Sequence, residues 1–213
     1  QFVKGFPANN VLLTGARGTG KSTLVKALLS DFSSAGLRII EVDKQDLLAL
    51  PDIVALINNR PERFIIFCDD LSFDASDPGY KALKVVLDGS ISATSENVLV
   101  YATSNRKHLM PEFMAENLET QYVGEEIRPG ETSEEKISLS ERFGLWLSFY
   151  AFDQDEYLRV AEHWLAQLGL KDFNEEARRA ALMFSLTRGA RSGRVAYQFA
   201  RDYAGRMALT AQK

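Results

Sequence analysis

Residues 15–22 read Gly15-Ala16-Arg17-Gly18-Thr19-Gly20-Lys21-Ser22, and no other segment of the chain constrains its architecture as strongly. The run matches the pattern G-x-x-x-x-G-K-[ST], in which glycines let the backbone curl until successive N–H groups point at one anion. An apolar run at 10–14 predicts a buried strand before it, and helical periodicity over 21–30 predicts a helix after it. The positive N-terminal end of that helix would face the same anion. The segment therefore predicts a phosphate-binding loop.

The residue types in this loop suit the triphosphate tail of a nucleotide. The Lys21 ammonium can reach the β- and γ-phosphates, and the Ser22 hydroxyl can bind Mg²⁺. ATP and Mg²⁺ are therefore the expected cofactors. The alternative, a glycine-rich turn without function, is disfavoured by the flanking strand and helix. The predicted nucleotide-binding residues are Gly15, Ala16, Arg17, Gly18, Thr19, Gly20, Lys21, Ser22 and Thr23.

Outward from the loop, apolar runs alternate with helical periodicity as far as residue 152. Alternation of this kind predicts βαβ units and a parallel sheet covered by helices on both faces. The expected fold class is therefore α/β, a P-loop NTPase parallel sheet sandwiched by helices. Further strands are predicted at 37–42, 64–68, 98–103 and 145–152, and further helices at 51–58 and 80–87.

After residue 152 the pattern changes to three helical periods, at 154–168, 174–187 and 192–207, with no strand signal. This change predicts two domains: an α/β nucleotide-binding domain at 1–152 and a small helical lid domain at 153–213. The acidic segment 110–136 has no clear period and predicts a long irregular insertion, a kind of loop that is often functional. The aromatic side chains of Trp146, Phe149, Tyr150 and Phe152 are expected in the core.

The composition is that of an ordinary globular protein. The 213 residues are 46% hydrophobic and 25% charged, and a formal charge of −4 argues against a surface that coats DNA. The single cysteine, Cys68, lies in an apolar run and indicates a reducing compartment. We find neither a signal peptide nor an apolar run of about 18 residues, so no membrane span is expected and a cytoplasmic location is predicted. The chain begins with Gln1 rather than Met and is expected to be a fragment.

Two carboxylates follow the predicted strand at 64–68. The carboxyl end of a parallel strand beside a phosphate loop is where Mg²⁺ needs an acidic partner, so Asp69 is expected to join Ser22 in the Mg²⁺ site. Asp70, one residue further on, is expected to orient or polarise the attacking water. The competing interpretation is that Asp70 or Ser72 caps a helix.

These motifs and those that follow resemble the AAA+ superfamily of P-loop ATPases, over about residues 10–206. Asp69-Asp70 is similar to the Walker B end of bacterial replication initiators and helicase loaders, whereas many other AAA+ proteins have Asp-Glu. The loop at 15–22, the run Phe67-Cys68-Asp69-Asp70-Leu71-Ser72-Phe73 and the run Arg188-Gly189-Ala190-Arg191-Ser192-Gly193-Arg194 are similar to a family of uncharacterised bacterial AAA+ proteins. The resemblance implies a sheet of AAA+ type with a C-terminal helical lid.

The resemblance also assigns roles beyond the loop. Thr103-Ser104-Asn105 resembles sensor 1, and the Asn105 amide can donate to phosphate and accept from water; a plain turn residue is the alternative. Arg142 in the run 139–144 resembles an arginine finger, which would act in trans on a neighbouring subunit and would require a homo-oligomer. The alternative for Arg142 is a surface ion pair with an acid such as Glu141.

The start of the last predicted helix carries two arginines. Either Arg191 or Arg194 resembles sensor 2, the lid arginine that reaches back to the nucleotide, and Ser192 is expected to be the helix N-cap. The sequence leaves the choice between the two arginines open. A solvated basic helix face is the alternative for both.

The motifs together predict a hydrolase that binds Mg-ATP and couples hydrolysis to a conformational change acting on an unknown macromolecular client. A non-hydrolysing module that ATP merely switches is the first alternative, with Asp70 inert. A P-loop kinase is the second, although no acceptor pocket or arginine-rich lid is recognisable. A GTPase is disfavoured because Asn105-Arg106-Lys107-His108 is not the Asn-Lys-x-Asp motif that reads guanine.

Overall fold

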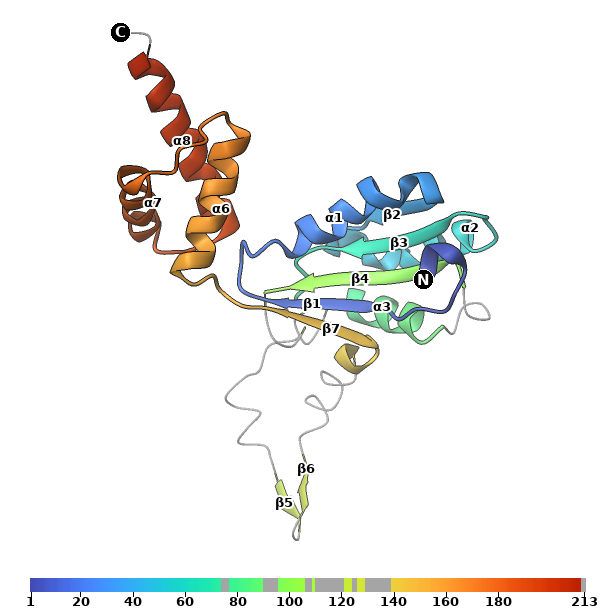
Figure 1. The fold of residues 1–213 in the computed structure, drawn as a ribbon. Coiled ribbons are helices and arrows are strands. Elements are labelled where there is room, and N and C mark those ends of the chain that lie inside the picture. The colour runs from blue at the N-terminus through green and yellow to red at the C-terminus, as the bar shows by residue number, and fades with distance from the viewer. Residues whose placement is uncertain are drawn as a thin grey trace. The chain divides into compact units, whose positions relative to one another are not determined.

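The computed structural model describes residues 1–73, 77–89, 96–105, 109, 121–123, 126–128 and 139–211. The chain divides into two compact units. The first contains Gln1–Gly15 and Lys21–Ser148, and the second contains Ala16–Gly20 and Phe149–Lys213. Figure 1 labels the elements of both units.

The elements of the first unit are η1 (Phe2–Lys4), β1 (Val11–Gly15), α1 (Lys21–Phe32), η2 (Ser33–Ala35), β2 (Leu37–Glu41), η3 (Lys44–Ala49), α2 (Leu50–Ile57), β3 (Arg63–Cys68), α3 (Gly79–Leu87), β4 (Val98–Ser104), β5 (Gln121–Val123), β6 (Glu126–Arg128) and β7 (Leu145–Phe149, whose last residue is grouped with the second unit). Those of the second unit are α6 (Gln154–Gln167), α7 (Glu175–Arg188) and α8 (Gly193–Ala211).

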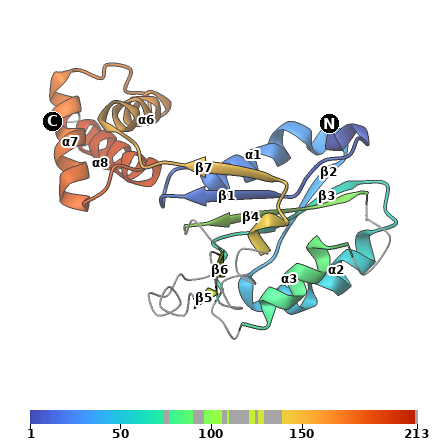
Figure 2. The same cartoon turned by 90° about the horizontal axis from the view of Figure 1, so that it is seen from below.

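The central sheet has five strands in the order β2-β3-β4-β1-β7. Its core ladder is parallel: Ile65 pairs with Leu99, and Leu13 pairs with Thr103. Helix α1 covers one face of this sheet, and α2 with α3 covers the other (Figure 2). The predicted fold class, a parallel sheet between helices with helices at the C-terminus, is confirmed.

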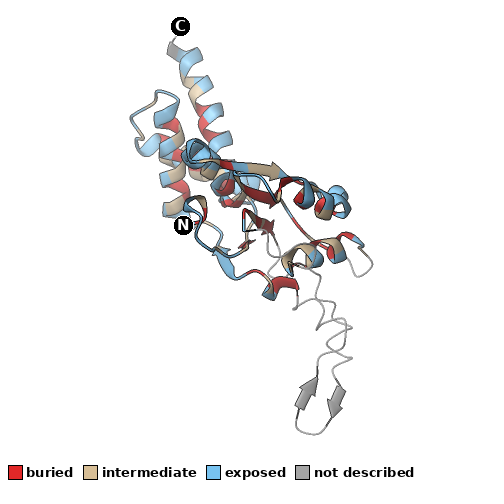
Figure 3. Cartoon of the chain, turned by 90° about the vertical axis from the view of Figure 1, so that its right-hand side faces the viewer, coloured by how far each residue is buried: buried red, intermediate tan, exposed pale blue. Residues whose placement is uncertain are grey.

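Strand β3 explains why a continuous apolar run suits the middle of this sheet. Phe64, Ile66 and Cys68 are buried in the core that contains Leu50 of α2 and Leu83 of α3. Side chains alternate between the faces of a strand, so Phe67 lies on the α1 side. There the Lys26 ammonium is 5.9 Å from its ring centroid. Both faces of β3 are therefore buried. Figure 3 colours the buried residues of the chain red.

Cys68 offers a direct check on this core. Its side chain is inaccessible to solvent, and burial raises the pKa of the thiol to about 12. Because the thiolate is the reactive form, we expect a maleimide to label the native protein at least roughly 100-fold more slowly than the protein unfolded in urea. Mass spectrometry of timed reactions measures the difference. Equal rates would show that β3 opens readily.

Strand β7 departs from its prediction. It ends at Phe149 rather than at 152, and it lies at the edge of the sheet. The expectation that its aromatic side chains are core is wrong for Trp146, which is 38% exposed, and for Tyr150, which is 82% exposed. An edge strand has a neighbour on one side only, and an apolar run in the sequence does not reveal this position.

The predicted insertion at 110–136 contains some regular structure. Strands β5 and β6 pair antiparallel, with Tyr122 opposite Ile127. The remainder of the predicted insertion lies outside the described residues. The same holds for His108, the last residue of the run that was compared with the guanine-reading motif.

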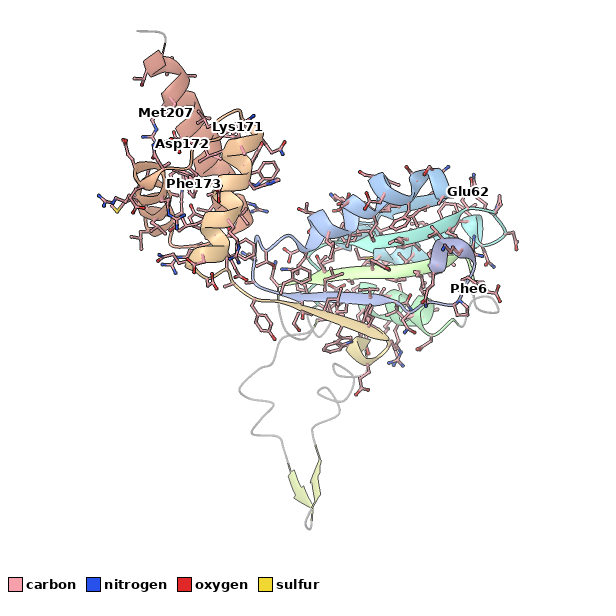
Figure 4. The ribbon with its side chains drawn as sticks, viewed as in Figure 1. Phe6, Glu62, Lys171, Asp172, Phe173 and Met207 are labelled. Atoms are coloured by element: carbon pink, nitrogen blue, oxygen red, sulfur yellow. The ribbon has the colours of Figure 1, made fainter. Side chains whose placement is uncertain are left out.

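The second unit owes its three helices to clear start and stop signals. Asp153 and Glu156 form a capping box at the start of α6, with N–H to carboxylate distances of 2.7 and 3.0 Å. Asn174 caps α7, and Gly189 ends that helix with φ of 65°. Tyr157 and Phe199 are buried between the helices, and Phe173 and Met207 pack against this core (Figure 4).

Candidate nucleotide-binding site

Three strands of the first unit end at one edge of the sheet, and two of them are followed there by polar side chains. β1 ends at Gly15, β3 is followed by Asp69, and β4 is followed by Asn105. β4 lies between β1 and β3, and parallel strands place their carboxyl ends at the same edge. In folds of this kind that edge is where ligands bind.

Lys21, the first residue of α1, lies within this edge. Its ammonium donates to the Gly15 carbonyl at 2.8 Å and to Asn105 Oδ1 at 3.0 Å. The side chain is only 6% exposed, so most of its length is fixed by the protein. The cation is thereby held beside Gly15, where the phosphate loop begins, and an incoming anion would meet a positive charge that is already placed.

Ser22 and Asp69, the two predicted magnesium ligands, are in direct contact. The Ser22 hydroxyl donates to Asp69 Oδ1 at 2.7 Å. Thr103 Oγ1 lies 2.5 Å from the same carboxylate oxygen. The Asp69 carboxylate is therefore oriented by one hydroxyl from α1 and another from β4.

Asp70 and Asn105 form a second contact at this edge. The Asn105 amide nitrogen donates to Asp70 Oδ1, while its amide oxygen accepts from Lys21. Asp70 has φ of 49°, the one left-handed non-glycine conformation among the described residues. Strained backbone of this kind gathers at functional sites, and aspartate tolerates it better than most residues. No helix begins at Asp70 or Ser72 in the described chain, where the next helix, α3, starts at Gly79.

The chemistry of the edge fits a magnesium ion. Mg²⁺ takes oxygen ligands, and in nucleotide sites one or two protein oxygens are completed by phosphate and water. Ser22 Oγ and Asp69 supply such oxygens side by side. In the part of the chain that the structure describes, no three His, Cys, Asp or Glu side chains gather into a metal cage.

Residues 16–20 of the phosphate loop belong to the second unit, where they contact the start of α8. The Gly193 N–H donates to the Gly18 carbonyl at 2.8 Å. Gly18 has φ of +74°, and a Cβ added there would lie 2.9 Å from Ser192 Cβ. Glycine is therefore required at position 18 both by its backbone conformation and by the close approach of Ser192. The predicted cap is present, since Ser192 Oγ accepts from the Val195 N–H at 3.3 Å.

Both candidate lid arginines are exposed beside this contact. Arg194 is the nearer: its Cβ would be 3.7 Å from a Cβ built on Gly18, whereas no atom of Arg191 lies among the three nearest neighbours of that position. The remaining predicted loop residues differ in exposure. Thr19 is buried and donates to the Ala16 carbonyl at 2.9 Å, while Arg17, Gly20 and Thr23 are exposed.

Arg142 is not brought to this edge of its own sheet. It precedes β7, so it lies at the amino end of the strands, where its guanidinium pairs with Asp88 rather than with Glu141. A cavity of about 600 Å³ at that end is lined by Arg142, Phe6 and Asn10, among others. Figure 4 labels Phe6 at this end of the unit. A finger acting in trans would also lie away from the site of its own chain.

The structure shows contacts for Thr103, which the sequence placed in the run that resembles sensor 1 but to which it gave no role. It lies two positions before Asn105 and contacts both Asp69 and the backbone of Asp70. Because threonine is a β-branched residue that is common in strands, its presence at the end of β4 did not by itself indicate a role for the hydroxyl. The pairing of β4 with β3 brings its hydroxyl to the Asp69 carboxylate and to the Asp70 N–H.

Solved structures of three other proteins share this architecture. A mutant of RuvB from Thermotoga maritima matches with a TM-score of 0.58 and 17% identity over 99% of this chain and 59% of that one. The replication initiator DnaA bound to AMPPCP and single-stranded DNA matches at 0.57 and 15% over 94% and 58%. A DNA replication initiation factor matches at 0.52 and 15% over 98% and 56%. The chain thus spans less than two thirds of each. No curated protein matches it.

The sheet order and these likenesses define the class: the fold is that of an AAA+ protein. The AAA+ type of fold that the motifs indicated is confirmed. Within this class, the chain belongs to the family described as "Protein of unknown function (DUF815)", whose model matches residues 1–207. Among the described residues, no helix combines the length and the apolar character needed to cross a membrane.

Proposed function

We propose that this protein binds Mg-ATP and hydrolyses it as an AAA+ ATPase, coupling turnover to a conformational change that acts on a macromolecular client. The observation that carries the proposal is one hydrogen-bonded network at the carboxyl ends of the strands. Side-chain bonds join Lys21 to Asn105 and Asn105 to Asp70, and another joins Ser22 to Asp69. The Asp70 N–H donates to Asp69 Oδ1 at 3.1 Å and connects the two sets. The replication initiator DnaA, which shares the fold, was solved with the ATP analogue AMPPCP, and this supports ATP as the ligand.

Each side chain in the network has a proposed role. Lys21 and the loop N–H groups hold the phosphates, while Ser22 and Asp69 hold Mg²⁺, which when bound neutralises charge on the phosphates. Asp70 accepts a proton from, or orients, the attacking water, and Asn105 fixes the Asp70 carboxylate while facing the γ-phosphate. Arg142 of an adjacent subunit and Arg194 of the lid add positive charge to the transition state, with Arg194 preferred over Arg191 because it flanks Gly18.

One observation favours the non-hydrolysing alternative. Asp70 is already hydrogen bonded to Asn105, and its side chain is one carbon shorter than the glutamate found in many AAA+ proteins. In a module that ATP only switches, this contact would hold Asp70 away from any water. Hydrolysis and binding must therefore be measured separately.

Replacing Asp70 with asparagine separates the two functions. The amide is isosteric with the carboxylate but accepts no proton, so we expect kcat for ATP hydrolysis to fall roughly 10²- to 10⁴-fold. The affinity for ATP should stay close to that of the parent, because the Lys21 and Ser22 contacts are retained. Phosphate release measures turnover, and a fluorescent ATP analogue measures binding, both at protein concentrations that favour assembly.

Asp52→Asn is the matched control, since Asp52 belongs to the first turn of α2, outside this network. Hydrolysis by the parent that Asp70→Asn leaves intact would contradict the role of Asp70. No turnover by any form, with binding retained, would favour the switched module. Transfer of phosphate to a small molecule instead of water would favour a kinase.

A further inference from the structure

One hydroxyl contacts both residues that follow β3: the carboxylate of Asp69 and the backbone N–H of Asp70. Thr103 Oγ1 is 2.5 Å from Asp69 Oδ1 and accepts a hydrogen bond from the Asp70 N–H at 2.8 Å. Thr103 is 1% exposed, so water does not compete for these bonds. A hydroxyl has one proton and two acceptor sites, and donating to Asp69 while accepting from Asp70 uses the group consistently.

The two contacts act on the two residues that the proposed chemistry needs, Asp69 for magnesium and Asp70 for the attacking water. The first orients Asp69 beside Ser22, whose hydroxyl donates to the same Oδ1 atom. The second holds the N–H of Asp70 where φ is 49° and the chain turns away from β3. Through these two bonds, the Thr103 hydroxyl links the orientation of the Asp69 carboxylate to the backbone position of Asp70.

The backbone of Thr103 has a separate task. Its carbonyl accepts from the Leu71 N–H at 2.7 Å, a bond that any side chain at position 103 would allow. Ser104, the next residue, is also buried, but its hydroxyl donates to the Leu71 carbonyl at 2.8 Å and to neither carboxylate. The Ser104 hydroxyl therefore supports the turn at Leu71, whereas the Thr103 hydroxyl contacts the Asp69 carboxylate and the Asp70 N–H.

We propose that Thr103 is a positioning residue, whose hydroxyl fixes Asp69 for magnesium and Asp70 for the attacking water. This inference rests on the proposed function and assigns to Thr103 a task that the motifs leave open. Groups that orient a metal ligand typically change metal affinity or activity roughly 10- to 100-fold when they are removed. The effect of losing the Thr103 hydroxyl should therefore appear first in the dependence on Mg²⁺.

The test compares Thr103→Val, which keeps the shape but not the hydroxyl, with Thr103→Ser, which keeps the hydroxyl. Binding of a fluorescent ATP analogue is titrated with Mg²⁺ and repeated in EDTA. We expect Thr103→Val to raise the half-saturating Mg²⁺ concentration roughly 10-fold or more, with unchanged affinity in EDTA. Thr103→Ser should restore the parent value. Amide exchange at Asp70 should be faster in the valine variant, because its N–H loses the nearer of its two acceptors and keeps only Asp69 Oδ1, at 3.1 Å.

Ser104→Ala is the control for losing a buried hydroxyl. It should lower the melting temperature while leaving the Mg²⁺ dependence as in the parent. The inference is overturned if Thr103→Val needs no more Mg²⁺ than the parent, or if Ser104→Ala shifts the dependence equally. If the parent itself binds the analogue no better with Mg²⁺ than in EDTA, the proposed Mg-ATP function fails, and the inference fails with it. These outcomes are distinct, because only the last concerns the parent protein.

Discussion

Lys21→Ala is expected to weaken ATP binding on the order of 100-fold, the loss of about 3 kcal/mol that follows when one partner of a buried charged contact is removed. Lys21 as a residue is 6% exposed, and its ammonium is already held by Gly15 and Asn105, so little conformational freedom is lost when phosphate binds. Isothermal titration with ATP and Mg²⁺ measures the change in Kd.

Lys26→Ala provides the matched control for this change. Lys26 lies on the same helix, but its side chain is 55% exposed and pairs with Glu41 at 3.0 Å. An exposed ion pair contributes little, so this variant should bind ATP within about threefold of the parent. Equal affinity for ATP in Lys21→Ala and in the parent would remove the basis for calling residues 15–22 a nucleotide site.

The parts of the site that the sequence predicted are those that topology dictates. Once residues 10–14 and 64–68 are parallel strands, Gly15 and Asp69 must emerge at one edge of the sheet, and α1 must begin there with Lys21. The 2.7 Å contact between Ser22 and Asp69 follows from that arrangement. No detail of side-chain packing is needed to expect it.

Other features depend on tertiary contacts that a local pattern does not encode. Trp146 reads as core because its neighbours are apolar, yet strand order places β7 at an edge. The ion pair of Arg142 joins it to Asp88, 54 residues earlier, whereas the sequence suggested the adjacent Glu141. The contact of Gly18 with Gly193 likewise joins segments that only the folded second unit brings together.

Arg142→Ala is expected to reduce kcat for ATP hydrolysis on the order of 10³-fold, at the lower end of the effect of an arginine finger, while ATP affinity is retained. The reason is geometric: Arg142 lies at the amino end of the strands, and Lys21 and Asp69 lie at the carboxyl end. Because Arg142 lies at the opposite end of the strands from its own site, an arginine finger at this position would act on the site of a neighbouring subunit. Phosphate release at increasing protein concentration measures the loss.

The ion pair with Asp88 supplies the control that distinguishes a finger from a structural arginine. If Arg142 served only to anchor α3 through Asp88, Asp88→Ala would reduce turnover as much as Arg142→Ala does. For a finger, Asp88→Ala leaves the guanidinium available, and turnover should remain within about threefold of the parent, because a partly exposed pair contributes little.

Mixing two inactive variants tests the action in trans most directly. A subunit with Asp70→Asn keeps its Arg142, and a subunit with Arg142→Ala keeps its Asp70, so an interface between them contains one complete site. Random assembly of equal amounts should recover turnover well above that of either variant alone, because a restored site regains roughly 10³-fold in rate. Recovery requires that the two groups come from different chains. A mixture no faster than the average of its components would place Arg142 outside the catalytic site, whatever its effect as a single substitution.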